Sequence, residues 1–117
     1  MFNFEKLDVW HKSVALAESV YSVTKLFPSD ERFGLTNQMR RAAVSISSNI
    51  AEGCSRGSKP DFRRFIEIAT GSVFELVSQA RVARGQGILP SADHDALYQS
   101  ALEITRMLTG LRDSLRD

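Results

Sequence analysis

Residues 35–53, with the sequence LTNQMRRAAVSISSNIAEG, decide the fold of this chain. Apolar side chains recur along the stretch at helical spacing, at Leu35, Met39, Ala42, Ile46 and Ile50. Several positions of the stretch carry alanine or serine, and small side chains allow neighbouring helices to approach closely. The stretch therefore predicts a helix that is packed tightly within a helical protein.

Three further stretches show the same kind of periodicity, over about residues 6–27, 58–84 and 90–116. The last two carry clean apolar stripes, and no segment alternates with the period of two that a β-strand shows. Four amphipathic helices of similar length with short connections are typical of one architecture. We predict an all-α protein, an antiparallel up-down-up-down four-helix bundle that forms a single domain over residues 1–117.

Local signals place the ends of these helices. Pro28 stops the first helix, and residues 29–31 supply turn chemistry and a possible single helical turn. The connection at residues 53–58 is rich in glycine and serine, and Ser58 is well placed to cap the third helix. The glycines of residues 85–87 close that helix.

The first helix carries more apolar surface than a one-sided helix needs. We assign the seam of the bundle to one stripe, made up of Leu7, Trp10, Val14, Ala17, Tyr21 and Thr24. A second stripe lies about 120° around the helix and consists of Val9, Leu16, Val20, Val23 and Phe27. Either the helix lies between two neighbours of its own bundle, or a second subunit covers part of it.

Leu16, Val20, Val23 and Phe27 are our candidates for a subunit boundary. Phe74 is a further candidate because it points away from the apolar stripe of the third helix. An isolated aromatic residue of this kind can simply be exposed, or it can contact a subunit or another partner.

Composition points to a soluble protein of ordinary globular type. The chain has 117 residues, a formal net charge of +1 and a single cysteine, Cys54, so it can form no internal disulfide. We interpret Cys54 as a packed, unreactive thiol. The N-terminal stretch lacks the pattern of a signal peptide, and no stretch is apolar for long enough to span a membrane. We expect a cytoplasmic protein.

Residues for catalysis or metal binding are scarce. A di-metal centre in a four-helix bundle uses Glu-x-x-His on two helices, but the only histidines are His11 and His94. No zinc-type cluster, nucleophile elbow or phosphate-binding glycine loop occurs. We predict a protein that is not an enzyme and that has no cofactor and no metal site.

Basic residues gather in the middle of the chain. Residues 32–64 hold seven arginines and lysines against two acids, although the whole chain is nearly neutral. Such a cluster can hold phosphates without reading sequence, or it can be an ordinary solvated surface. Our candidate nucleic-acid-binding residues are Arg40, Arg41, Arg56, Lys59, Arg63 and Arg64.

The chain resembles a known family through an ordered set of residues. These are Phe4, Leu7, Val9, Trp10, Phe27, Pro28, Glu31, Gly34, Leu35, residues 38–42, Ser45, Ile46, residues 49–53, Phe62, Phe65, Ala69, Gly71 and Ser72. The pattern, most specific in QMRRAAVSI and NIAEG, closely resembles bacterial four-helix bundle proteins encoded in intervening sequences of 23S rRNA genes. It is also similar to accessory proteins of diversity-generating retroelements. His11 departs from the pattern, where many members have glutamine.

The resemblance implies a small cytosolic bundle that forms a homo-oligomer, with a pentamer as the expected form. The retroelement proteins that it resembles bind nucleic acid and a reverse transcriptase. Our leading hypothesis is a non-enzymatic oligomeric bundle that binds RNA or DNA through backbone charge. The alternative is an interaction scaffold that recruits a polypeptide partner, with its arginines serving solubility or subunit contacts.

Overall fold

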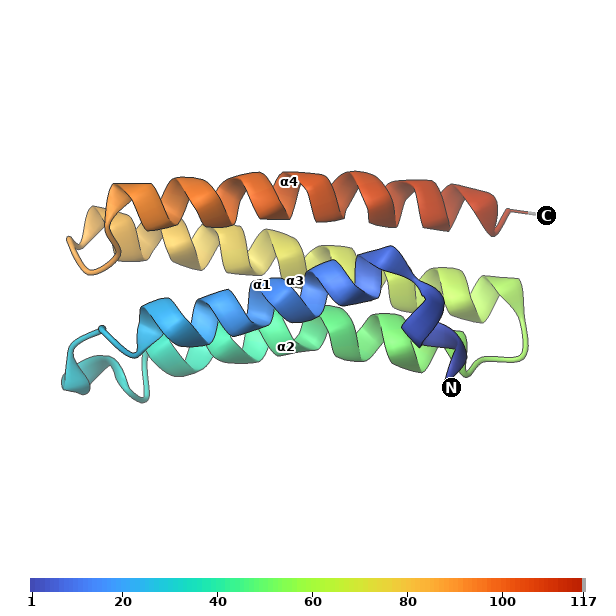
Figure 1. Ribbon diagram of the computed structural model, residues 1–117, viewed down its shortest axis with the longest axis horizontal. Helices are drawn as coiled ribbons and strands as arrows, with labels where there is room; N and C mark the ends of the chain where they lie inside the picture. Colours follow the sequence, from blue (N-terminus) through green and yellow to red (C-terminus); the bar gives the residue numbers. More distant parts are fainter. Residues whose placement is uncertain (117) are drawn as a thin grey trace.

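The computed structural model describes residues 1–116 and shows four long helices and no strand in that range. The helices are α1 (Asp8–Thr24), α2 (Leu35–Cys54), α3 (Lys59–Gly85) and α4 (Ser91–Ser114), with short 3₁₀ helices η1 (Asn3–Lys6) and η2 (Ser29–Glu31). They run alternately up and down in an elongated bundle of 46 × 21 × 21 Å (Figure 1). The predicted antiparallel four-helix bundle is confirmed.

The small residues of α2 lie against α3, and these two helices share the most extensive contact in the bundle. Ala43 is fully buried, and a Cβ atom on Gly53 would lie 3.0 Å from side-chain atoms of both Phe62 and Phe65. The hydroxyls of Ser45 and Ser72 form a hydrogen bond of 2.9 Å across the same contact. The close approach predicted from the alanines and serines is therefore present.

The structure corrects the assignment of the two stripes of α1. The buried residues of α1 are Val9, Ser13, Leu16, Ala17, Val20 and Thr24, of which three belong to the second stripe and two, Ala17 and Thr24, to the first. Tyr21, which we assigned to the seam, is 40% exposed. Both α2 and α4 contact α1. The broad apolar arc of α1 is therefore packed against two helices of the same chain.

The same burial corrects the predicted subunit boundary on α1. Val20 has no exposed surface, and Leu16 and Phe27 are buried as well. A side chain that its own bundle covers has no surface left for a second subunit, so these three residues belong to the core. Val23 is half-buried at the edge of a groove, and Phe74 is 64% exposed.

The helix ends follow the predicted signals with small shifts. Helix α1 ends at Thr24 rather than at Phe27, because the chain tightens there into shorter hydrogen-bonded turns before Pro28. The hydroxyl of Ser58 accepts the amide of Asp61 at 3.2 Å and caps α3 as predicted. Beyond α3, Gly87 has a φ of 74° and allows the chain to turn into α4.

The start of α2 depends on Glu31, one of the acids in the stretch 29–31 whose turn and N-cap chemistry suits a helix start. The amide of Leu35 donates to Oε1 of Glu31 at 3.0 Å. A Cβ atom on Gly34 would lie 2.7 Å from that oxygen. Gly34 is therefore needed for close approach of the Glu31 side chain, which satisfies a free amide at the start of the helix.

Candidate nucleic-acid interface

One end of the bundle collects four of the six predicted basic residues. Because α2 and α3 are antiparallel, the turn between them brings together Arg56, Lys59, Arg63 and Arg64 (Figure 1). We call these four residues the basic end. The C-terminal end of α4 lies at the same end of the molecule.

Local contacts hold two of these side chains over one aromatic ring. The guanidinium carbon of Arg56 lies 4.5 Å from the centroid of the Phe65 ring, and that of Arg64 lies 5.9 Å from it. Arg56 also forms an ion pair of 3.1 Å with Glu52. Stacking on an aromatic face orients a guanidinium without removing its charge.

The side chains of the other two members of the basic end differ in how firmly they are held. Nη1 of Arg63 donates to the carbonyl oxygen of Leu115 at 2.8 Å, which joins α3 to the end of α4. Lys59 is exposed and forms no ion pair with residues 1–116. A hydrogen bond to a backbone carbonyl does not cancel the charge of Arg63. Apart from the paired Arg56, the turn therefore carries three cations, Lys59, Arg63 and Arg64, and one acid, Asp61.

Arg40 and Arg41 lie apart from the basic end. They precede Arg56 by some four turns of helix, which corresponds to roughly 24 Å along the axis. Nε of Arg40 donates to the hydroxyl of Thr24 at 2.8 Å, and its guanidinium lies 4.5 Å from the centroid of the Tyr21 ring. Arg40 therefore ties α2 to α1, whereas Arg41 is exposed.

A shallow hollow surrounds this second pair of arginines. Its volume is about 440 Å³, and it is lined by Tyr21, Asn37, Arg40, Arg41, Val44, Ser45 and Ser48. Hydroxyl, amide and guanidinium donors all border the hollow, and these are groups that contact phosphate. The six predicted basic residues thus form two separate clusters on one molecule.

An N-terminal aromatic segment adjoins the basic end, and we did not predict this from the sequence. The side-chain amide of Asn3 donates to the carbonyl oxygen of Cys54 at 2.9 Å, next to the turn that carries Arg56. The rings of Phe2, Phe4 and Trp10 follow one another in this segment. The only signal in the sequence was two phenylalanines before the first helix.

Cys54 itself is a half-buried free thiol. Burial raises the pKa of the Cys54 thiol. A raised pKa leaves less of the nucleophilic thiolate at neutral pH. This direction agrees with the expectation of a packed thiol at the end of α2.

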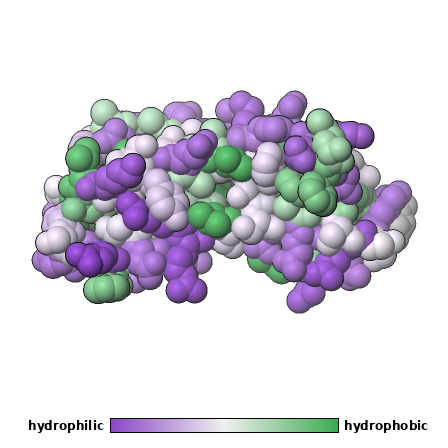
Figure 2. Space-filling view, turned by 60° about the horizontal axis from the view of Figure 1, so that its bottom comes forward, coloured by the Kyte–Doolittle hydropathy of each residue, from purple (hydrophilic) through white to green (hydrophobic). Residues whose placement is uncertain are grey.

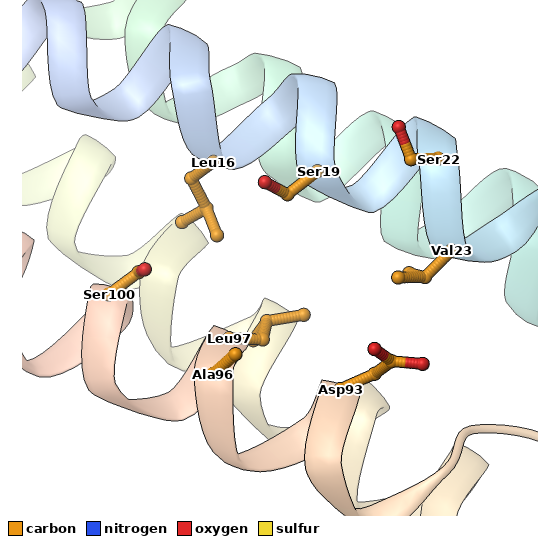
Figure 3. A pocket seen from close by; sticks show the side chains of 8 residues that line it. All are labelled: Leu16, Ser19, Ser22, Val23, Asp93, Ala96, Leu97 and Ser100. Carbon is orange, nitrogen blue, oxygen red and sulfur yellow. The ribbon is translucent and has the colours of Figure 1, made fainter.

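Two grooves lie between helices on the sides of the bundle, one with a mixed lining and one with a mainly apolar lining. One, of about 270 Å³, opens between α1 and α4, where Leu16, Val23 and Leu97 face the gap in Figure 3. The other, of about 210 Å³, lies between α3 and α4 and is bordered by Phe74, Tyr98 and Leu102. All three of these bordering side chains are exposed.

The surface of residues 1–116 mixes hydrophobic and hydrophilic side chains (Figure 2). Figure 2 shows hydrophobic side chains in several separate patches among hydrophilic ones on the face in view. Within residues 1–116, no three histidines, cysteines or acids gather where they could hold a metal ion. No helix in that range combines the length and apolarity that a membrane crossing requires.

The fold and the placement of the basic residues define a small four-helix bundle with a charged end. A family model for the 23S rRNA-intervening sequence protein matches residues 5–110, and the chain belongs to this family. The predicted family membership is therefore confirmed. A search of curated proteins found no significant match.

One solved structure supports the fold independently. It is a protein of unknown function from the S23 ribosomal protein family of Bacteroides thetaiotaomicron. It superposes with a TM-score of 0.82 over 89% of this chain and 97% of the other, at 22% sequence identity. At this identity the similarity shows a shared fold and carries no information on activity.

Proposed function

We propose that this protein is a non-enzymatic homo-oligomeric bundle that binds RNA through backbone phosphates. The observation that carries the proposal is the basic end, where Lys59, Arg63 and Arg64 face one acid, Asp61. Charge of this kind binds phosphates by releasing counterions and does not read base sequence. The hollow at Arg40 and Arg41 supplies a second site on each subunit.

Oligomerisation strengthens such binding in the proposed mechanism. Each subunit alone presents only a few phosphate contacts. Several copies in one assembly place repeated weak sites on the same nucleic acid, which raises the effective concentration of each site. The groove at Phe74, Tyr98 and Leu102 supports this part of the proposal, because exposed apolar side chains from two helices meet there.

Retardation of a structured RNA by the purified protein tests the proposal. We expect the affinity to fall steeply between low and physiological salt. Replacing Arg40, Arg41, Arg63 and Arg64 together by alanine should abolish most of the binding, provided that circular dichroism shows an intact helical fold. Unchanged affinity in the folded variant would contradict the assignment of the site.

The alternative function is a scaffold that recruits a polypeptide partner, and the groove at Phe74 favours it as well. A pull-down after nuclease treatment separates the two functions, because a scaffold retains its protein partner when the nucleic acid has been removed. A homo-oligomer covers this groove with its own copies. A monomer that binds no RNA would leave the groove free and would favour the scaffold.

A further inference from the structure

Four aromatic rings form a continuous column at the N-terminal end of the bundle. Phe2 and Phe4 stack with centroids 5.7 Å apart and an angle of 19° between their planes. Phe4 meets Trp10 at 4.9 Å, and Trp10 meets His11 edge-on at 5.0 Å. We call this set the aromatic column.

Phe2 is the open end of the column. Its side chain is 71% exposed, whereas Phe4 and Trp10 are half-buried. A single exposed aromatic residue is common on protein surfaces. Phe2 differs from that ordinary case because its ring is held parallel to a second ring, so one flat face is fixed and the other is free for a planar ligand.

Specific hydrogen bonds hold the segment that carries this ring. The amide of Phe2 donates to Oε1 of Glu5 at 3.0 Å, and the carbonyl oxygen of Glu5 lies 2.7 Å from Nε2 of His11. The bond from Asn3 to the carbonyl of Cys54 fastens the segment to α2. The ring of Phe2 is thus presented on an ordered support, which lowers the entropy lost when a ligand stacks on it.

The same bond from Asn3 brings the column beside the basic end. Phe2 is adjacent to Asn3, and Arg56 lies two residues after Cys54. The charged residues close in sequence to this junction are Lys6, Arg56 and Lys59 against Glu5, Asp8, Glu52 and Asp61. Arg64 lies over the same Phe65 ring as Arg56. Glu5 accepts the Phe2 amide and Glu52 is paired with Arg56, so both carboxylates already have donors.

We infer that this end of the bundle binds unpaired nucleotides, with a base stacked on Phe2 and the adjoining phosphates on Lys59 and Arg64. The inference rests on the proposed nucleic-acid function and specifies its substrate as single-stranded. Proteins that bind single strands combine a basic track with aromatic rings on which bases stack. The base faces inside a duplex are already stacked on each other, so a duplex offers phosphates along its length but a free face only at its two terminal base pairs.

Binding of two labelled probes tests the inference: a twelve-nucleotide oligouridylate and a blunt RNA duplex of the same length. The protein should carry no N-terminal tag. We expect Phe2→Leu, which keeps an apolar side chain but removes the ring, to weaken binding of the single strand by roughly fivefold to a hundredfold. Binding of the duplex should change little.

Phe33→Leu is the matched control, because Phe33 is 85% exposed and lies in the connection between α1 and α2. It should leave the affinity for both probes unchanged. Trp10 is the single tryptophan of the chain and contacts Phe4, so its emission should change when oligouridylate binds, but not when the duplex binds.

The outcomes separate this inference from the function on which it rests. In one outcome, both probes bind in a salt-dependent manner with affinities that Phe2→Leu does not change. That result would overturn the stacking site and keep the phosphate site. Equal weakening of both probes would also overturn it, because the ring would then not select unpaired bases. Binding of neither probe at low salt would overturn the proposed function together with the inference.

Discussion

The side-chain amide of Asn3 donates a hydrogen bond of 2.9 Å to the backbone carbonyl of Cys54, across 51 positions of the sequence. The carbonyl belongs to the last residue of α2, where helix geometry leaves it without a partner in its own helix. Asn3 supplies that partner. One bond thus satisfies the end of α2 and fixes the aromatic column beside the basic end.

Removal of this bond should loosen the N-terminal segment while keeping the bundle. We expect Asn3→Ala to lower the free energy of unfolding by about 1 kcal/mol, because the bond is exposed to water. Amide hydrogen exchange at residues 3–6 should accelerate more than exchange in α2 or α3. Gln99→Ala, an exposed change on α4, is the control. Equal protection of residues 3–6 in both variants would contradict the role of the bond.

Gly53 should tolerate no side chain, because α3 lies too close. A Cβ atom would meet Phe62 and Phe65 at 3.0 Å, so Gly53→Ala should destabilise the protein by about 1–3 kcal/mol. Gly71→Ala is the control, since no atom lies within 4 Å of its Cβ position on α3, and it should stabilise the protein by up to ~1 kcal/mol. Urea unfolding at one protein concentration measures both. Similar midpoints for the two variants would refute the close approach.

Two adjacent arginines should differ in their effect on stability. Arg40→Gln removes the bond to Thr24 and the contact with the Tyr21 ring, so we expect a loss of about 1–2 kcal/mol. Arg41→Gln removes the same charge from an exposed position and should cost less than about 0.5 kcal/mol. Thermal and urea unfolding would measure the difference. A larger loss for Arg41→Gln would show that Arg40 does not join α1 to α2.

The exposed groove at Phe74 should mediate self-association. Phe74→Asp places a charge among apolar side chains of the groove, and a charge there opposes burial by a second copy. Light scattering should therefore show a lower mass for this variant than for the unaltered protein. Phe33→Asp removes an equally large exposed ring that does not line the groove and lies in the connection between α1 and α2, so it should leave the mass unchanged. A mass that Phe74→Asp does not alter would exclude this surface as the subunit contact.

The sequence was sufficient for the architecture because the evidence for it is local. The apolar stripes of α3 and α4, the Ser58 cap and the glycines after α3 each act within a few residues. In α1 the same reasoning assigned the seam to the less buried of two stripes, although both contribute to the core. Its apolar residues cover about 200° of the helix, and periodicity alone does not show which part faces two neighbours and which part faces water.

The candidate site was predictable only in part for the same reason. Helix polarity alone brings Arg56, Lys59, Arg63 and Arg64 together, because they flank one turn. The contact between Asn3 and Cys54 joins residues that no local pattern relates, so the aromatic column could not be placed beside them. The structural role of Arg40 was likewise hidden, since it depends on Thr24 in another helix.

The salt dependence of RNA affinity tests the central claim most directly. We would measure the slope of the logarithm of affinity against the logarithm of salt concentration for Lys59→Gln/Arg64→Gln. Arg81→Gln/Arg106→Gln, which removes the same charge from exposed positions on α3 and α4 away from the turn, is the control. The first variant should reduce the slope by roughly two and the control should leave it unchanged. Equal slopes for the two variants would show that the basic end does not contact the RNA.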